Sequence, residues 1–238
     1  MKKRGLMLRI PDLLTLVNLM LGFTSIIYTI NADYTMAATF ILLSVIIDAF
    51  DGFFARMLSA ESKIGMELDS MADLVSFGVA AGILAYTLYL KTTGGFIVCT
   101  LIPVCAAIRL ARYNIVHQRS YFTGLPTPAV GGFIASLAYT QTRLENTHLM
   151  VIFAVLAYLM VSEIKYPRFT KTELKKRSPT FIMLAATAIL PLIDRRLLII
   201  PFTTYILIGV FTETGLIKKQ AKRGAETNTK KEKKFAGD

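Results

Sequence analysis

The sequence of 238 residues contains no tryptophan, two cysteines and two histidines. Without tryptophan, an aromatic belt at a membrane surface would rest on the 10 tyrosines, together with lysine and arginine. Cys99 and Cys105 lie six positions apart in one apolar run. On a helix these two residues would be about 9 Å apart and would point in different directions. A disulfide bond between them is therefore excluded.

The sequence also lacks a segment polar enough to form a soluble domain. Apolar residues make up 54% of the chain, and the mean hydropathy is +0.53. Long apolar runs follow one another with hardly a polar face, as is typical of a multi-pass membrane protein. The basic start MKKRG resembles a signal peptide, but the apolar stretch that follows is too long and has no cleavage site. We expect this stretch to be retained as the first span.

Eight apolar segments are expected to cross a membrane as helices. The fifth and seventh are shorter than the roughly 20 residues that a span usually needs, and only the sequence DRR separates the seventh from the eighth. The alternative is a bundle of six spans, with one of these pairs tilted or re-entrant. We predict an all-α polytopic bundle over residues 1–216 and a basic, disordered tail over residues 217–238. The eight segments are 10–31, 35–57, 65–90, 94–116, 126–142, 147–164, 179–193 and 196–214.

The basic residues fall on one side of this predicted bundle. The chain has 27 lysines and arginines against 16 acidic residues. If the N-terminus is cytoplasmic, all of the basic residues except Lys91, Arg143, Arg195 and Arg196 lie at or near the cytoplasmic side. Cytoplasmic loops of membrane proteins carry such an excess. We therefore predict that both termini are cytoplasmic, that the chain lies in the cytoplasmic membrane among lipids, and that it binds no nucleic acid.

Four aspartates, Asp48, Asp51, Asp69 and Asp73, lie in the second and third apolar segments. An ionised carboxylate in hydrocarbon costs several kcal/mol unless it is paired, bound to metal or facing a polar cavity. Within each pair the aspartates are three or four positions apart, so they share one helix face. At about 1.5 Å per residue, both pairs would lie roughly 6–15 Å inside the cytoplasmic ends of their helices. We expect the two pairs to face each other there.

Four carboxylates with no nearby histidine or cysteine are typical ligands of a hard cation, Mg²⁺, Mn²⁺ or Ca²⁺. Because this is more than one ion usually needs, two ions that clamp a transferred phosphate are favoured. Gly52 and Gly65 would let a ligand approach closely, and Arg56 is placed to meet a phosphate. The alternative is a salt-bridge cluster with Arg56 and Lys63, but two bases cannot neutralise four acids.

The aspartates belong to a longer pattern, which reads Asp48-x-x-Asp51-Gly52-x-x-Ala55-Arg56, then eight residues, then Gly65-x-x-x-Asp69-x-x-x-Asp73. This pattern resembles the signature of the CDP-alcohol phosphotransferases at every fixed position. Enzymes of that family move a phosphatidyl-type group from a CDP-linked lipid to an alcohol and release CMP. The resemblance implies a homodimer that uses Mg²⁺ or Mn²⁺, with Asp73 as proton acceptor and as ligand of the second metal ion. It further implies metal binding by Asp48, Asp51 and Asp69 and contacts with the CDP moiety by Gly52, Arg56 and Ser62.

Three further stretches bear on the alcohol: SFGVA at 76–80, RLARYN at 109–114 and FTGLPTPAVGG at 122–132. Together they resemble the phosphatidylserine synthase branch of the family, over about residues 10–135. The resemblance implies transfer to the hydroxyl of L-serine from CDP-diacylglycerol or CDP-archaeol. Glycerol 3-phosphate, inositol phosphate, ethanolamine and choline are the alternative acceptors within the family.

The residues themselves offer partners for serine. Arg109 and Arg112 share one helix face at the cytoplasmic end of the fourth segment and suit a carboxylate or a lipid phosphate. Asn114 suits either charged group of serine. Ordinary anchoring of the helix end is the alternative for both arginines. Asn18, with Thr15 one turn before it, forms a polar face in the first segment, which favours a contact with CDP over a helix-packing bond.

Two functions outside this enzyme class also account for acids in a membrane. An ion transporter or proton relay would place its carboxylates near the midplane of the bilayer. A scaffold protein that only binds lipid would not require Asp73. The spacing of the four aspartates, with glycine and arginine between them and a position toward one surface, favours the enzyme.

Overall fold

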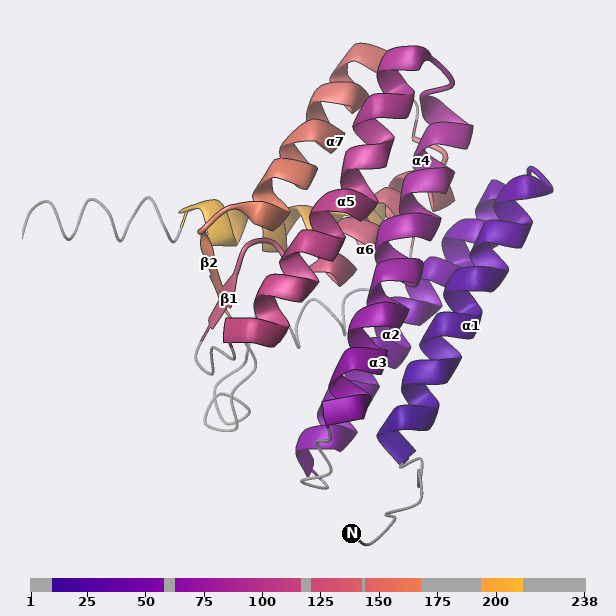
Figure 1. Ribbon diagram of the computed structural model, residues 1–238. Coiled ribbons are helices and arrows are strands. Elements are labelled where there is room, and N and C mark those ends of the chain that lie inside the picture. Colours follow the sequence, from indigo (N-terminus) through magenta and orange to yellow (C-terminus); the bar gives the residue numbers. More distant parts are fainter. Residues whose placement is uncertain (1–9, 58–62, 117–120, 143, 168–193, 212–238) are drawn as a thin grey trace, which may run out of the picture.

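A computed structural model describes residues 10–57, 63–116, 121–142, 144–167 and 194–211 (Figure 1). The described residues are helical, as the sequence predicts, except for connecting turns and two short strands. The helices are α1 Ile10–Ile30, α2 Tyr34–Met57, α3 Lys63–Asp73, α4 Ala80–Tyr89, α5 Thr93–Val116, α6 Thr127–Tyr139 and α7 Asn146–Val161, followed by 3-10 helix η2 Arg195–Leu198 and a helix over residues 199–211.

Helices α1 and α2 form a tightly connected antiparallel hairpin. Ala32 adopts a left-handed backbone conformation with φ of 60°, which reverses the chain directly after α1. The Asp33 carboxylate then accepts a hydrogen bond of 3.1 Å from the backbone N–H of Met36. This bond satisfies one of the unpaired N–H groups in the first turn of α2. The hairpin brings the far half of α2, which carries Asp48 and Asp51, alongside the first half of α1.

Helices α3 and α4 form one continuous helix with a π-helical segment, η1 Leu74–Val79, between them. The π-helical turn begins directly after Asp73. Such a turn is rare, and it is often found at functional sites. It packs closely against α1, because a Cβ on Gly22 would lie 2.7 Å from the Cα of Ser76. The π-helical turn therefore separates the helix that carries Asp69 and Asp73 from the buried helix α4.

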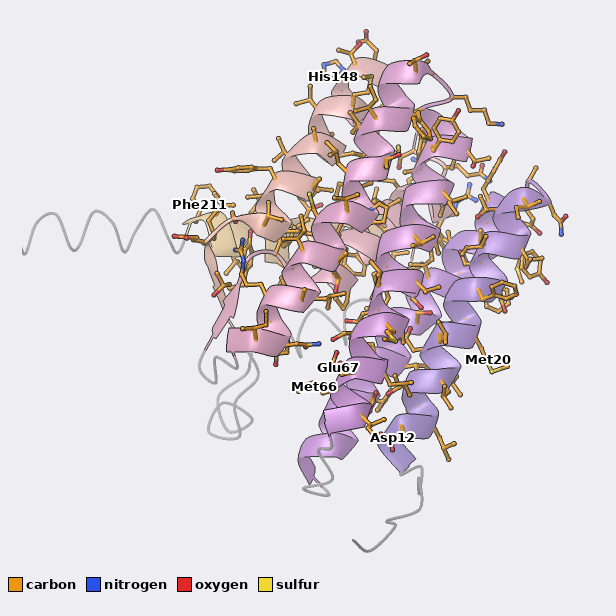
Figure 2. All side chains as sticks on the ribbon, in the orientation of Figure 1. Asp12, Met20, Met66, Glu67, His148 and Phe211 are labelled. Atoms are coloured by element: carbon orange, nitrogen blue, oxygen red, sulfur yellow. The ribbon has the colours of Figure 1, made fainter. Side chains whose placement is uncertain are left out.

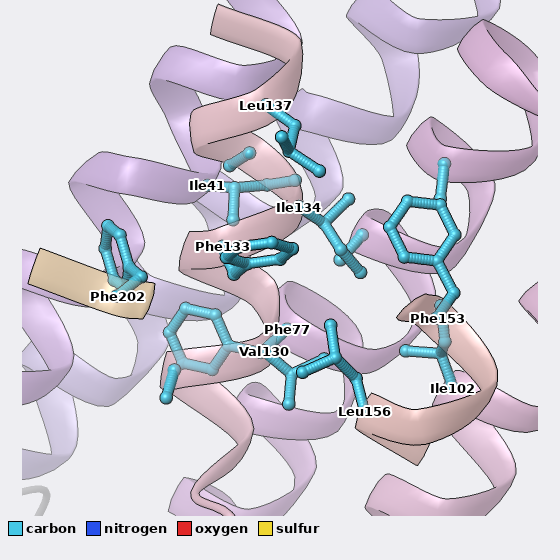
Figure 3. Close-up of a cluster of buried hydrophobic side chains, with 14 of the residues drawn as sticks. Ile41, Phe77, Ile102, Val130, Phe133, Ile134, Leu137, Phe153, Leu156 and Phe202 are labelled. Atoms are coloured by element: carbon cyan, nitrogen blue, oxygen red, sulfur yellow. The ribbon is translucent and has the colours of Figure 1, made fainter. Parts of the chain in front are cut away.

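Helix α6 forms the centre of the core (Figure 3). All but two of its 13 residues are buried. Gly131 and Gly132 permit this close packing, since a Cβ there would lie 2.9 Å from the Cα of Phe77 and 2.1 Å from the Phe202 ring. Phe202 comes from the helix over residues 199–211, so this late segment packs against the same core. At about 1.5 Å per residue, α6 is roughly 10 Å shorter than the hydrocarbon layer of a bilayer.

The two strands, β1 Tyr121–Thr123 and β2 Lys165–Pro167, pair antiparallel. They were not predicted from the sequence. Tyr166 is fully buried, and its ring lies 5.9 Å from that of Tyr205. The strand pair therefore joins the segment before α6 to the segment after α7.

Within the described residues, four helical segments are long and apolar enough to cross a membrane. Met20 and other exposed apolar side chains of α1 point away from the bundle, toward the space that lipid would fill (Figure 2). The larger count of eight stays a prediction, because α6 is short and buried and the predicted span at 179–193 lies outside the described residues. The tail at 217–238 also lies outside them. The four segments are Asp12–Ile30, Tyr34–Gly52, Ile64–Tyr89 and Thr93–Ile115.

Candidate active site

Three aspartates from two neighbouring helices converge at one point of the bundle. Carboxylate oxygens of Asp48 from α2 and of Asp69 and Asp73 from α3 all lie within 4.8 Å of one another. Asp48 and Asp69 are half-buried, and Asp73 is buried. Asp48 lies nine residues before the end of α2, and Asp69 lies six residues after the start of α3. These separations correspond to about 13 and 9 Å along the helix axes, so the cluster lies toward one end of the bundle.

Asp51 lies beside this cluster rather than within it. Its side chain is buried, and one carboxylate oxygen accepts a hydrogen bond from the Thr15 hydroxyl of α1. Asp51 is close enough to Asp69 for the two charges to interact. The sequence predicted four carboxylates facing one another; the structure groups three of them and holds the fourth against α1.

Asp73 is held from two sides by groups that are distant in sequence. The amide nitrogen of Asn18 lies 3.3 Å from one carboxylate oxygen of Asp73. The hydroxyl of Thr127, at the start of α6, lies 3.4 Å from the other. Arg109 of α5 is buried and donates to the same hydroxyl at 3.1 Å. Residues of α1, α5 and α6 therefore meet at the aspartate that the sequence singles out as the base.

One face of α1 supplies much of the polar environment. Thr15, Asn18 and Gly22 recur at helical spacing and face Asp51, Asp73 and the π-helical segment, respectively. The backbone carbonyl of Asn18 also accepts hydrogen bonds from the hydroxyls of two serines. The bond lengths are 3.4 Å from Ser44 of α2 and 2.9 Å from Ser76 of η1.

The Asn18 side-chain amide contacts Asp73 through its nitrogen, and its oxygen lies on the other side of the same amide group. This oxygen is buried and has no hydrogen-bond partner among the described residues. A buried amide oxygen without a partner costs free energy, about 1–3 kcal/mol. Among the described residues, the acceptor capacity of this oxygen is therefore unused.

Arg112 and Asn114, the other two residues predicted to contact serine, bond to the ends of neighbouring helices or to α3. Arg112 is exposed and donates to the backbone carbonyl of Val161 at the end of α7, at 3.0 Å. Asn114 donates to Glu67 at 3.0 Å and accepts from Ser70 at 3.2 Å, which ties α5 to α3. Of the three candidates, Arg109 is the one that the structure connects to Asp73 through a hydrogen-bonded hydroxyl.

The predicted contacts with CDP are only partly described. Asn18 lies at Asp73, and Gly52 is half-buried in α2, one position after Asp51. Arg56 belongs to α2, but its side chain lies outside the described part of the structure, and so does the whole of Ser62.

Thr127 was missed by the sequence reasoning. It belongs to the stretch FTGLPTPAVGG, which was recognised as a motif without a role for any one residue. The contact between Thr127 and Asp73 joins positions 54 apart. The only local signal for it is a hydroxyl in the first turn of a helix that is otherwise almost wholly buried and apolar.

The donor set at this site fits a hard divalent cation. All three converging ligands are carboxylates, and carboxylate oxygen is the ligand that Mg²⁺ and Mn²⁺ prefer. Carboxylates this close repel one another when ionised, and a cation between them removes the repulsion. Histidine does not add to this donor set among the described residues: His148 lies beside Glu145, at the opposite end of the bundle from Glu67, which is two residues before Asp69 (Figure 2).

The sequence profile of the CDP-alcohol phosphatidyltransferase family matches residues 8–164. The chain belongs to this family. Every aspartate of the site, together with Asn18, Arg109 and Thr127, lies within the matched residues. The protein is thus a CDP-alcohol phosphatidyltransferase with several apolar helices of membrane-spanning length, and the enzyme class inferred from the aspartate motif is confirmed.

Several curated relatives of this CDP-alcohol phosphatidyltransferase are similar over most of their length. The CDP-diacylglycerol–serine O-phosphatidyltransferase of Bacillus subtilis is 38% identical over 166 residues, which cover 68% of this chain and 92% of the relative. The enzyme of the same name from Helicobacter pylori is 35% identical over 174 residues, with coverage of 68% and 73%. The archaetidylserine synthase of Methanothermobacter thermautotrophicus is 34% identical over 171 residues, with coverage of 70% and 73%.

Proposed function

We propose that the protein transfers the phosphatidyl or archaetidyl group of a CDP-linked lipid to the hydroxyl of L-serine and releases CMP. The observation that carries this proposal is the cluster of Asp48, Asp69 and Asp73 in a chain that is similar, over most of its length, to relatives named for serine as the acceptor. Both diacylglycerol and archaeol are retained as the lipid, because the names of the relatives include both.

The reaction would be a single displacement at phosphorus. The serine oxygen forms a bond to the phosphorus that carries the lipid, and the bond from that phosphorus to the bridging oxygen of CMP breaks. The hydroxyl proton passes to the carboxylate of Asp73, a transfer that typically contributes 10²–10⁴-fold to the rate. The hydrogen bonds from Asn18 and Thr127 support this role, because they fix both oxygens of Asp73.

Mg²⁺ or Mn²⁺, in two sites, would be held by Asp48, Asp51, Asp69 and Asp73 and would supply positive charge against the phosphates. Asn18, Gly52, Arg56 and Ser62 would contact the CDP moiety. The unpartnered side-chain oxygen of Asn18 supports its place in this group. Arg109 would face the serine carboxylate. Arg112, which bonds to the end of α7, and Asn114, which ties α5 to α3, would contact serine from the edge of the site.

The catalytic domain would span residues 1–216 and lie in the cytoplasmic membrane as a homodimer. Both termini and the aspartate site would face the cytoplasm, so that CDP enters from water while the lipid tails stay in the bilayer. Asp48 lies in the C-terminal half of α2, and Asp69 and Asp73 lie in the N-terminal half of the continuous α3–η1–α4 helix. This off-centre position supports the arrangement over a transporter, in which carboxylates lie near the midplane.

The test of this proposal is CMP release by the purified protein from CDP-diacylglycerol and from CDP-archaeol. Serine, glycerol 3-phosphate, inositol phosphate and ethanolamine would be supplied in separate reactions. We expect CMP release that depends on serine and yields a serine phospholipid. Release that depends on another alcohol would keep the reaction class and replace the acceptor, and no release with any alcohol would contradict the proposed reaction.

A further inference from the structure

Thr127 lies between a buried cation and the proposed base. Its hydroxyl oxygen is 3.1 Å from a guanidinium nitrogen of Arg109 and 3.4 Å from a carboxylate oxygen of Asp73. The side chain is only 1% exposed. The hydroxyl is therefore enclosed by protein and makes both contacts out of reach of bulk water.

The direction of these hydrogen bonds follows from the groups that make them. A guanidinium has only donors, and an ionised carboxylate has only acceptors. Thr127 must therefore accept from Arg109 and donate its single proton to Asp73. A threonine or serine hydroxyl satisfies this order in the space of one small side chain, whereas valine fills the same space with neither group.

The segment before Thr127 fixes the position of this hydroxyl. Gly124 adopts φ of 82°, and a Cβ there would lie 2.1 Å from the carbonyl oxygen of Met160. The backbone N–H of Leu125 donates to Leu159 at 2.9 Å. The chain is thus held against the end of α7 directly before α6 begins at Thr127.

A capping role at the start of α6 does not explain the contacts of the Thr127 hydroxyl. A threonine at the start of a helix often caps unpaired backbone N–H groups. In α6 the cap position is Pro126, and no side chain caps the helix there. The polar contacts of the Thr127 hydroxyl instead point to Arg109 and Asp73, across to other helices.

We propose that Thr127 is a positioning residue for Asp73. With Asn18 on the other oxygen, it holds the carboxylate in the orientation that receives the serine proton and links it to the charge of Arg109. This inference rests on the proposed function, because it assigns Asp73 the proton of the acceptor. In this role Thr127 contacts neither CDP-lipid nor metal, and it acts through Asp73 and Arg109, the two side chains that its hydroxyl contacts.

Three variants test this role. Thr127→Val removes the hydroxyl at nearly constant volume, and Thr127→Ser keeps it. Thr140→Val is the matched control, since Thr140 is a buried threonine at the other end of α6 whose hydroxyl bonds to the backbone carbonyls of Ser136 and Leu137. The measurements are kcat and KM for serine-dependent CMP release, and binding of CDP-diacylglycerol and of Mn²⁺ without serine.

We expect Thr127→Val to lower kcat on the order of 10- to 100-fold, the range for a lost hydrogen bond to a charged group. In Thr127→Val, binding of CDP-diacylglycerol and of Mn²⁺ should stay within about threefold of wild type. Thr127→Ser keeps the hydrogen bond, so its kcat should lie within about threefold of wild type. Thr140→Val should match wild type in every measurement. If Thr127→Val does not fold, Thr127→Ala with the same serine rescue takes its place.

Three results would overturn the inference: wild-type kcat in Thr127→Val, a loss of Mn²⁺ or CDP-lipid binding as large as the loss of kcat, or a serine variant as slow as the valine variant. Failure of the underlying reaction would look different. In that case the wild-type protein itself would release no CMP when serine is added, whatever residue occupies position 127.

Discussion

The amide nitrogen of Asn18 lies 3.3 Å from a carboxylate oxygen of Asp73, across 55 positions of sequence. This contact joins the polar face of the first membrane helix to the helix of the aspartate motif. It predicts that Asn18→Ala lowers kcat on the order of 10-fold or more, because Asp73 loses a donor that orients it. Ser44→Ala is the control, since the Ser44 hydroxyl bonds to the Asn18 backbone carbonyl, at 3.4 Å, and not to its side chain among the described residues. This variant should keep near-native kcat. An alanine variant at position 18 with unchanged kcat and unchanged CDP-lipid affinity would remove Asn18 from the site.

Metal dependence follows from the converging carboxylates. Chelation with EDTA should abolish CMP release, and added Mg²⁺ or Mn²⁺ should restore it. Asp48→Asn and Asp69→Asn should each weaken binding of Mn²⁺ and lower kcat. The expected loss of transition-state stabilisation is roughly 2–4 kcal/mol for each variant. Glu67→Gln is the control, because Glu67 is an exposed acid of α3, the helix of Asp69, and hydrogen-bonds to Asn114. Full CMP release in EDTA would contradict a metal site.

The contact between Gly22 and the π-helical segment predicts an effect on stability. In Gly22→Ala the new Cβ would meet the Cα of Ser76 at 2.7 Å, so the backbone after Asp73 must shift. Overpacking of this kind costs about 1–3 kcal/mol, and thermal unfolding of the purified protein should report it. Gly94→Ala is the matched control, because its Cβ would meet only the flexible end of Met150, at 2.9 Å. Equal unfolding temperatures for both variants would show that the π-helical segment yields without cost.

Much of the fold could be predicted from the sequence. The first four apolar segments match helical segments in the structure to within two residues, because Asn31, Asp33 and Lys91 interrupt the apolar runs near where the helices end. The π-helical turn after Asp73 could not be predicted, since no local pattern marks it and its packing depends on Gly22 and Gly131 of other helices.

The candidate site was predictable to the extent that its residues lie close in sequence. The spacing of Asp69 and Asp73 places both on one face of a helix, and the short loop predicted between the second and third apolar segments is expected to bring Asp48 to them. The separation of Asp51 toward Thr15, and the contact of Thr127 with Asp73, depend on how whole helices pack. Helical periodicity within a single segment contains no information about such contacts.

The distribution of basic residues predicts the orientation of the chain. In a protein with Cys99→Ala and Cys105→Ala, a single cysteine at Lys233→Cys should be labelled only from the cytoplasmic side. A single cysteine at Lys91→Cys, in the connection between α4 and α5, should be labelled only from the outside. A membrane-impermeant maleimide applied to vesicles of known sidedness measures both. Labelling of both positions from one side would contradict the predicted topology.

The most direct test of the account is serine-dependent CMP release by Asp73→Asn compared with the wild-type protein. Asparagine keeps the shape and an oxygen ligand but cannot accept the serine proton. We predict that the variant binds CDP-diacylglycerol with metal at near-native affinity and releases CMP at a rate lower by 10²–10⁴-fold, the contribution of a positioned base. Release within about threefold of the wild-type rate would contradict the assignment of Asp73 as the base, because another group would then take the proton.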